Sequence, residues 1–203
     1  PDKAEPMRFE IALPHELKFA QESSFALSPD GRSLVFGASG SDGVRRLWIR
    51  PLNSLEAHSI SGTEFDGINF VFWSHDSRFV VFDAGAKLMK IPSSGGLAQT
   101  ICDLPKHSMG GSWNRDNVII FGTFVGDLMR VYAEGGAPVQ LTRVNRARQE
   151  MGHYFPNFLA DGRHFLYWCA SNIPENQGIY VGSLDASPEE QGSRQLVAGN
   201  AGL

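Results

Sequence analysis

Four copies of one short segment recur along this 203-residue chain at a nearly constant interval. The copies read SPDGRSLVF at 28–36, SHDSRFVVF at 74–82, NRDNVIIF at 114–121 and LADGRHFLY at 159–167. Aligned on their aspartates, Asp30, Asp76, Asp116 and Asp161, they are separated by 46, 40 and 45 residues. A period of about 40–45 residues is typical of stacked structural repeats, so this feature constrains the fold more than any other.

Each copy lies within a longer unit that predicts four short strands. A large apolar residue stands three positions before each aspartate, and an aromatic residue closes the strand that follows. Third strands are expected at 46–52, 87–93, 127–133 and 178–184, and fourth strands at 57–61, 98–102, 138–142 and 193–197. Glycine-rich turns such as PSSGG (92–96) join the last two strands. Helical periodicity is weak even in the best candidate, 144–153, which favours an all-β chain.

The unit predicts a β-propeller with four four-stranded blades at about 25–63, 70–104, 110–144 and 154–198. One blade cannot bury both of its faces, so blades stack around an axis and large residues such as Trp73 and Trp113 fill the seams. Residues 7–13, MRFEIAL, alternate like a lone N-terminal strand that completes another blade. The whole chain, 1–203, is interpreted as a single propeller domain or a fragment of one.

The aspartate turns are predicted to be structural. An aspartate caps such a turn through its carboxylate, and a following glycine accepts the positive φ that the turn requires. We therefore assign Asp30, Asp76, Asp116 and Asp161 to the turns between first and second strands, and not to catalysis or metal binding.

Composition limits the function classes. The chain has 18 basic and 22 acidic residues, which leaves no excess of positive charge for nucleic acid. No run of about 18 apolar residues occurs, so direct membrane contact is not expected. Cys102 and Cys169 each adjoin an apolar run, which predicts two separate buried thiols, with a single disulfide as the alternative. The sequence starts without Met or a signal-peptide pattern, which favours a segment of a longer protein.

FALSPDGRSLVF (25–36), WSHDSRFVVF (73–82) and SGGLAQTICD (94–103) resemble the TolB-type, WD-repeat-like β-propeller. More narrowly, RLWIRPLNSLEA (46–57), GSWNRDNVIIF (111–121) and the stretch 155–185 resemble the C-terminal propeller domains of bacterial, acidobacteria-like, membrane-anchored serine/threonine protein kinases. The resemblance covers about 8–197 and implies an extracytoplasmic sensor, periplasmic or at the cell surface. It also implies about six blades, so four blades correspond to an incomplete six-bladed ring. Without such a tether the compartment is unknown.

The sequence lacks the common motifs for catalysis and metal binding. It contains no protein-kinase signature, so any kinase activity would lie outside this chain. It contains no G-x-S-x-G elbow, no H-x-x-x-H or C-x-x-C pair and no D-x-D-x-D-G loop. We therefore expect a non-enzymatic chain with no catalytic residue, no cofactor and no metal site.

Ligand binding is expected at an axial face, where loops from successive blades converge. The loops that lead from one blade to the next carry the polar residues with the longest reach: Lys106, His107, Arg143, Arg146, Arg148, His153 and Tyr154. Three arginines within six residues predict contact with an anionic group. A solvated basic loop paired with Glu150 is the alternative.

Three functions are consistent with the sequence. The first is a non-catalytic interaction or sensor module that binds a protein or a small ligand at the axial face. The second is a propeller enzyme, such as a lyase, lactonase or glycan hydrolase, with a loop-borne active site. The third is a half-propeller that self-associates through open blade edges, because unpaired edges pair with other strands.

Overall fold

The computed structural model describes residues 17–19, 24–64, 70–105, 107–124, 126–191 and 195–198. Apart from two single-turn 3-10 helices, Arg146–Arg148 and Pro174–Asn176, the regular elements of this part are all strands. The prediction of an all-β propeller is confirmed. The expected lone strand at 7–13 lies outside the described residues.

Each repeat folds into one antiparallel sheet whose strands follow chain order. The first blade contains β2 (Phe25–Leu27), β3 (Ser33–Ser39), β4 (Arg45–Pro51) and β5 (His58–Ser59), and the two-residue β1 (Lys18–Phe19) also pairs with β3. The second contains β6 (Val71–Trp73), β7 (Phe79–Ala84), β8 (Lys87–Pro92) and β9 (Gln99–Asp103). The third contains β10 (Ser108–Trp113), β11 (Val118–Thr123), β12 (Leu128–Tyr132) and β13 (Val139–Gln140). The fourth contains β14 (Glu150–Phe158), β15 (His164–Ser171), β16 (Gly178–Ser183) and β17 (Gln195–Ala198).

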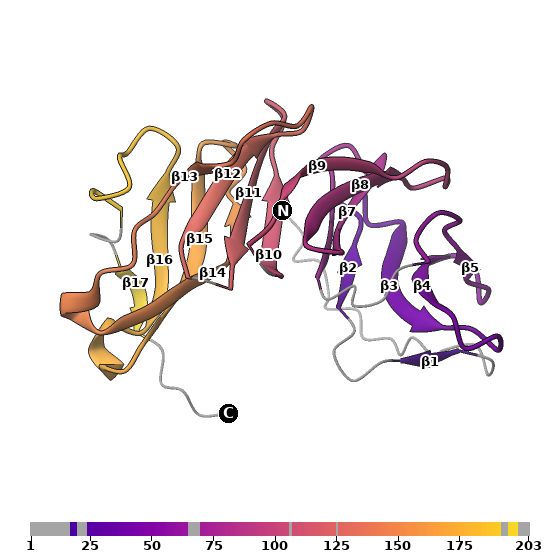
Figure 1. Cartoon of the computed structure of the whole chain (residues 1–203), viewed down its shortest axis with the longest axis horizontal. Coiled ribbons are helices and arrows are strands. Elements are labelled where there is room, and N and C mark those ends of the chain that lie inside the picture. Colours follow the sequence, from indigo (N-terminus) through magenta and orange to yellow (C-terminus); the bar gives the residue numbers. More distant parts are fainter. Residues whose placement is uncertain are drawn as a thin grey trace, which may run out of the picture.

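The four sheets follow one another along an arc, with the first and the fourth blade at its two ends (Figure 1). The first strand of each blade contacts the first strand of the next: β2 meets β6, β6 meets β10 and β10 meets β14. These four strands therefore line the axis, and the fourth strands lie at the periphery.

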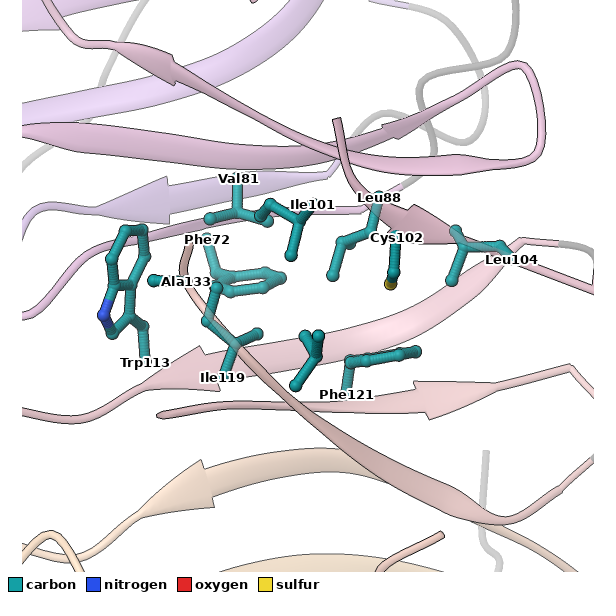
Figure 2. Close-up of a cluster of buried hydrophobic side chains, with 11 residues drawn as sticks. Phe72, Val81, Leu88, Ile101, Cys102, Leu104, Trp113, Ile119, Phe121 and Ala133 are labelled. Atoms are coloured by element: carbon teal, nitrogen blue, oxygen red, sulfur yellow. The ribbon is translucent and has the colours of Figure 1, made fainter. Parts of the chain in front are cut away.

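Apolar seams between neighbouring blades hold the arc together. In the seam between the second and third blades, Phe72 and Val81 face Trp113, Ile119 and Phe121 (Figure 2). Equivalent clusters join the first blade to the second and the third to the fourth. Removing one such large side chain from water contributes about 1.5–3 kcal/mol, so face-to-face stacking is the main stabilising interaction of the arc.

The four aspartate turns share one backbone geometry. The residue after each aspartate has a positive φ: Gly31, Ser77, Asn117 and Gly162. In the first two blades the carboxylates of Asp30 and Asp76 accept hydrogen bonds from a serine hydroxyl and from a backbone N–H. In the fourth, Asp161 accepts from the backbone N–H groups of Arg163 and His164 and bonds the His164 ring.

The prediction for Asp116 is wrong in its detail. In the third turn Asn114 Oδ1 accepts from the N–H groups of Asp116 and Val118, at 3.0 and 2.9 Å. Asn114 Nδ2 also donates to the carbonyl of Gly162 in the next blade, at 2.7 Å. This turn is one residue shorter than the others, and the longer asparagine side chain replaces the paired serine and aspartate.

Candidate functional site

A large cavity lies on the axis, at the face that carries the aspartate turns. It measures about 620 Å³ and is lined by the ends of all four inner strands and by the turns that follow them. Its wall includes Trp113, Asn157 and Leu159, and charged side chains at its rim include Arg115 and Asp161. We call this cavity the axial funnel. It combines aromatic, amide and oppositely charged groups, a lining that suits a peptide-like ligand.

Two glycines in β10 allow close packing around the axis. A Cβ at position 111 would lie 2.5 Å from Cε1 of Phe72, and a Cβ at position 110 would lie 3.1 Å from Cα of Phe155. The sequence GGSW at 110–113 therefore lets neighbouring inner strands approach β10 closely.

The predicted arginines line a second, basic pocket of about 430 Å³ at the opposite end of β14. Arg146 and Arg148 lie on the 3-10 helix that leads into β14, and Arg143 precedes it. Glu150 and His153, at the start of β14, line the same pocket, whereas Phe158 at the end of that strand lines the axial funnel. The two cavities therefore open at opposite faces of the propeller.

The arginines of the basic pocket already have protein partners. Arg143 Nη1 lies 3.2 Å from Glu189 Oε1, and Arg148 Nη2 donates to the Tyr180 hydroxyl at 2.6 Å. Arg146 Nη1 donates to the carbonyl oxygen of Glu150 at 3.2 Å. The alternative of a loop balanced by Glu150 therefore describes part of this geometry, with Glu189 as a second counter-charge.

His153 lines the basic pocket, but it is not an exposed group. It is buried, with Nδ1 2.8 Å from Thr142 Oγ1 and Nε2 3.1 Å from Glu150 Oε2. Burial opposes ionisation of Glu150, but the His153 and Asn145 hydrogen bonds and the charge of Arg148 lower the pKa of this carboxyl overall. The ring therefore belongs to a buried network between the third and fourth blades.

The other predicted residues do not join this pocket. His107 follows the second blade, and its Nδ1 lies 3.3 Å from Asp83 Oδ2. Tyr154 is half-buried on β14, and burial raises the pKa of its hydroxyl. Lys106 lies outside the described residues.

Both cysteines are free and buried, as the first interpretation of the sequence predicted. Burial raises the pKa of Cys102 to about 11 and that of Cys169 to about 12. Cys102 lies in the seam between the second and third blades, and Cys169 in the seam between the third and fourth. They are inert thiols at neutral pH in the absence of a metal.

No family model matches the sequence, and neither does any curated protein. Solved structures do match. A putative TolB from Agrobacterium tumefaciens has a TM-score of 0.63 and 16% identity, over 87% of this chain and 62% of that one. An oligogalacturonate lyase in complex with manganese has a TM-score of 0.59 and 19% identity, over 79% and 49%.

A chain of a mitotic checkpoint complex is also similar, with a TM-score of 0.58 and 16% identity over 92% of this chain and 56% of that one. The fold is thus that of a β-propeller, and TolB-type propellers are among its structural neighbours. This chain spans less than two thirds of each of these three matched chains. Among the residues that the structure describes, no helix is long and apolar enough to cross a membrane.

Proposed function

We propose that this chain is a non-catalytic interaction module whose axial funnel binds an extended segment of a partner protein. The observation that carries the proposal is the funnel itself, because residues of all four blades line it. Leu27 and Leu159 at its wall are 53% and 39% exposed, and they offer apolar contact beside the amide of Asn157. The similarity to a chain of a protein complex supports protein binding in general.

The finer role rests on the resemblance to kinase-associated propellers. On that resemblance the propeller is the extracytoplasmic part of a bacterial receptor-like serine/threonine kinase, and its partner binding is the sensing event. The funnel would then receive a periplasmic or cell-surface segment, and any catalytic step would take place in another domain.

The proposal is tested with a displayed library of random short peptides selected on the immobilised chain. Peptides bound in the funnel should lose affinity by about tenfold or more in Leu159→Glu, because a charge in an apolar contact loses at least the hydrophobic contribution. Leu97→Glu is the matched control, since Leu97 is 87% exposed and does not line the funnel. Peptides that bind L159E and wild type equally would contradict the funnel as the site.

A propeller enzyme is the second candidate, because an oligogalacturonate lyase shares the fold. It predicts saturable turnover by the purified chain. Unsaturated product formed from oligogalacturonate, with loss of turnover in Asn157→Ala, would replace the interaction proposal.

Self-association is the third candidate, and the outer face of the fourth blade favours it. Leu166, Trp168, Ile179 and Val181 alternate along β15 and β16 on the side away from the third blade and are incompletely buried. The equivalent face of the first blade is covered by Leu17, and Phe19 packs against Phe36 there. A dimer in sedimentation that dissociates in Trp168→Glu would support this candidate.

A further inference from the structure

A buried cluster of three side chains with metal-ligand chemistry lies in the seam between the third and fourth blades. Glu150 and His153 belong to β14, and Cys169 is the cross-strand partner of His153 on β15. Their candidate ligand atoms, one from each residue, all lie within 4.8 Å of one another. All three side chains are buried.

A β-bulge brings these residues to one face. In a regular strand, residues three apart point to opposite faces, so Glu150 and His153 would not meet. The register shifts between Glu150 and Gly152, and the extra residue turns the two side chains to the same side. Such bulges are used to re-aim side chains next to functional sites.

We propose that Glu150, His153 and Cys169 form a Zn²⁺-binding site. One thiolate, one imidazole and one carboxylate are ligands that Zn²⁺ accepts, and a site with three protein ligands keeps a fourth position open. The thiol excludes a preference for Mg²⁺ or Ca²⁺, which take oxygen ligands. On binding, Cys169 releases its thiol proton to solvent and coordinates as the thiolate.

Neighbouring residues form hydrogen bonds to the ligand side chains and fix their orientation. Thr142 Oγ1 lies 2.8 Å from His153 Nδ1. In the tautomer that carries its proton on Nδ1, the ring donates to this hydroxyl oxygen, and the lone pair of Nε2 is available to the metal. The N–H of Asn145 donates to Glu150 Oε2 at 2.7 Å. Arg148 Nε lies 3.5 Å from Glu150 Oε1 and places a positive charge beside the site. Zn²⁺ bound by one thiolate and one carboxylate has no net charge, so the guanidinium repels this unit less than it would repel a free cation.

An independent observation is the hydroxyl of Tyr167. This side chain is 1% exposed, and its hydroxyl has no hydrogen-bond partner among the residues that the structure describes. The Tyr167 ring packs edge-on against His153 with centroids 4.9 Å apart, and Tyr167 lies two residues before Cys169 on the same face of β15. A buried phenol without a partner is costly, and a metal-bound water in the open position would give it one.

The basic pocket of about 430 Å³ adjoins the site. Glu150 and His153 line this pocket, whereas Cys169 is not part of its lining. An ion would therefore enter past Glu150 and His153. Arg143 and Arg146 at the same pocket would attract an anion to the open position of the metal. The site lies away from the axial funnel, so it is independent of peptide binding there.

The test is a titration of the whole purified chain with Zn²⁺ against a competing chelator, repeated with Co²⁺ as a spectroscopic probe. We expect one tight Zn²⁺ equivalent, and a thiolate-to-cobalt charge-transfer band in the Co²⁺ form. Cys169→Ala should lose that band and weaken Zn²⁺ binding by about tenfold or more. Cys102→Ala is the matched control, because Cys102 is equally buried and free but lies in the other seam.

Loss of the band in C169A and its retention in C102A, with both variants folded by circular dichroism, supports the site. If C169A does not fold, Glu150→Gln and Tyr167→Phe replace it, and E150Q should weaken binding while Y167F keeps the thiolate band. Wild-type protein that binds no Zn²⁺, unchanged Zn²⁺ affinity in E150Q, or a thiolate band of equal intensity in C169A overturns the proposal.

Discussion

Phe155 in the inner strand of the fourth blade packs against Phe70, which precedes the inner strand of the second, with ring centroids 5.7 Å apart. The third blade lies between these two blades along the arc, and Gly110 in its inner strand β10 lies against Phe155. Phe155 adopts a φ of 53°, a left-handed conformation that costs free energy in a residue with a side chain. The aromatic contact across the axis offsets this strain, and it depends on the missing side chain at position 110.

Substitution of Gly110 by alanine should therefore lower the free energy of unfolding by about 1–3 kcal/mol. Gly110 has a φ of 77°, and the new Cβ would lie 3.0 Å from Phe155 Cδ1 and 3.1 Å from its Cα. Gly40→Ala is the control, because its Cβ would lie 3.1 Å from Oδ1 of the exposed Asp42 side chain and not against a backbone atom, and its φ lies outside the left-handed region. Chemical denaturation measures both, and equal stability of G110A and G40A would contradict the packing argument.

The third turn gives a prediction that separates Asn114 from Asp116. Asn114→Ala removes two acceptor contacts within the turn and the donor contact to Gly162 of the next blade. We expect a loss of about 1–3 kcal/mol in thermal or chemical unfolding, since these groups are mostly buried. Asp116→Asn should change stability by less than about 0.5 kcal/mol, because its carboxylate makes no hydrogen bond to the described residues. A larger loss of stability in Asp116→Asn than in Asn114→Ala would show that Asp116 caps this turn.

The fourth turn makes stability depend on acid pH. The hydrogen bond from His164, followed by those from two backbone N–H groups, lowers the pKa of Asp161 from 3.8 to about 2. Because the folded-state pKa is depressed, the contribution of Asp161 is fully present above pH 3.8 and is lost as the pH falls towards about 2. In Asp161→Asn the melting temperature should fall less steeply between pH 3.8 and about 2 than in the wild type. Above pH 3.8 its dependence on pH should be unchanged. A wild-type slope in D161N would show that other carboxyls control acid unfolding.

The repeat interval was sufficient to predict the blades, because four strands in each period can bury their faces only by stacking. Local turn chemistry was predicted where Asp30, Asp76 and Asp161 act, but the shortened third turn transferred the role to Asn114. The site was harder to predict. Whether His153 points to solvent or into a seam depends on bulges in β14, and no periodicity in the sequence marks them.

The bulge in β14 is also the reason why no sequence motif marks the cluster of Glu150, His153 and Cys169. Two of its members are three apart on a strand and the third lies across a strand pair, so no spacing typical of metal sites appears. The axial funnel was missed for another reason. Long polar loops with charged side chains predicted a site at one axial face, whereas the larger of the two cavities lies at the opposite face, where the ends of the inner strands and the turns after them line it.

Removal of the hydroxyl from each of two buried tyrosines of the fourth blade should change the free energy of unfolding in opposite directions. Tyr167 and Tyr180 stack with centroids 5.8 Å apart, and both are about 1% exposed. Within the described part of the chain the Tyr167 hydroxyl has no hydrogen-bond partner, whereas that of Tyr180 donates to the Asn176 carbonyl and accepts from Arg148. In metal-free protein, Tyr167→Phe should therefore raise the free energy of unfolding by about 1 kcal/mol or more, and Tyr180→Phe should lower it by about 1–3 kcal/mol.

Chemical denaturation in the presence of a chelator measures both variants with the wild type as reference. Each substitution removes one oxygen from the same stacked pair, so the change in packing is matched and the difference reports hydrogen bonding alone. Saturating Zn²⁺ should then stabilise the wild type by more than Y167F, because only the wild type gives its metal-bound water a phenolic partner. Destabilisation by Y167F in the chelated protein would mean that the hydroxyl has a partner without the metal, and would remove the independent support for the site.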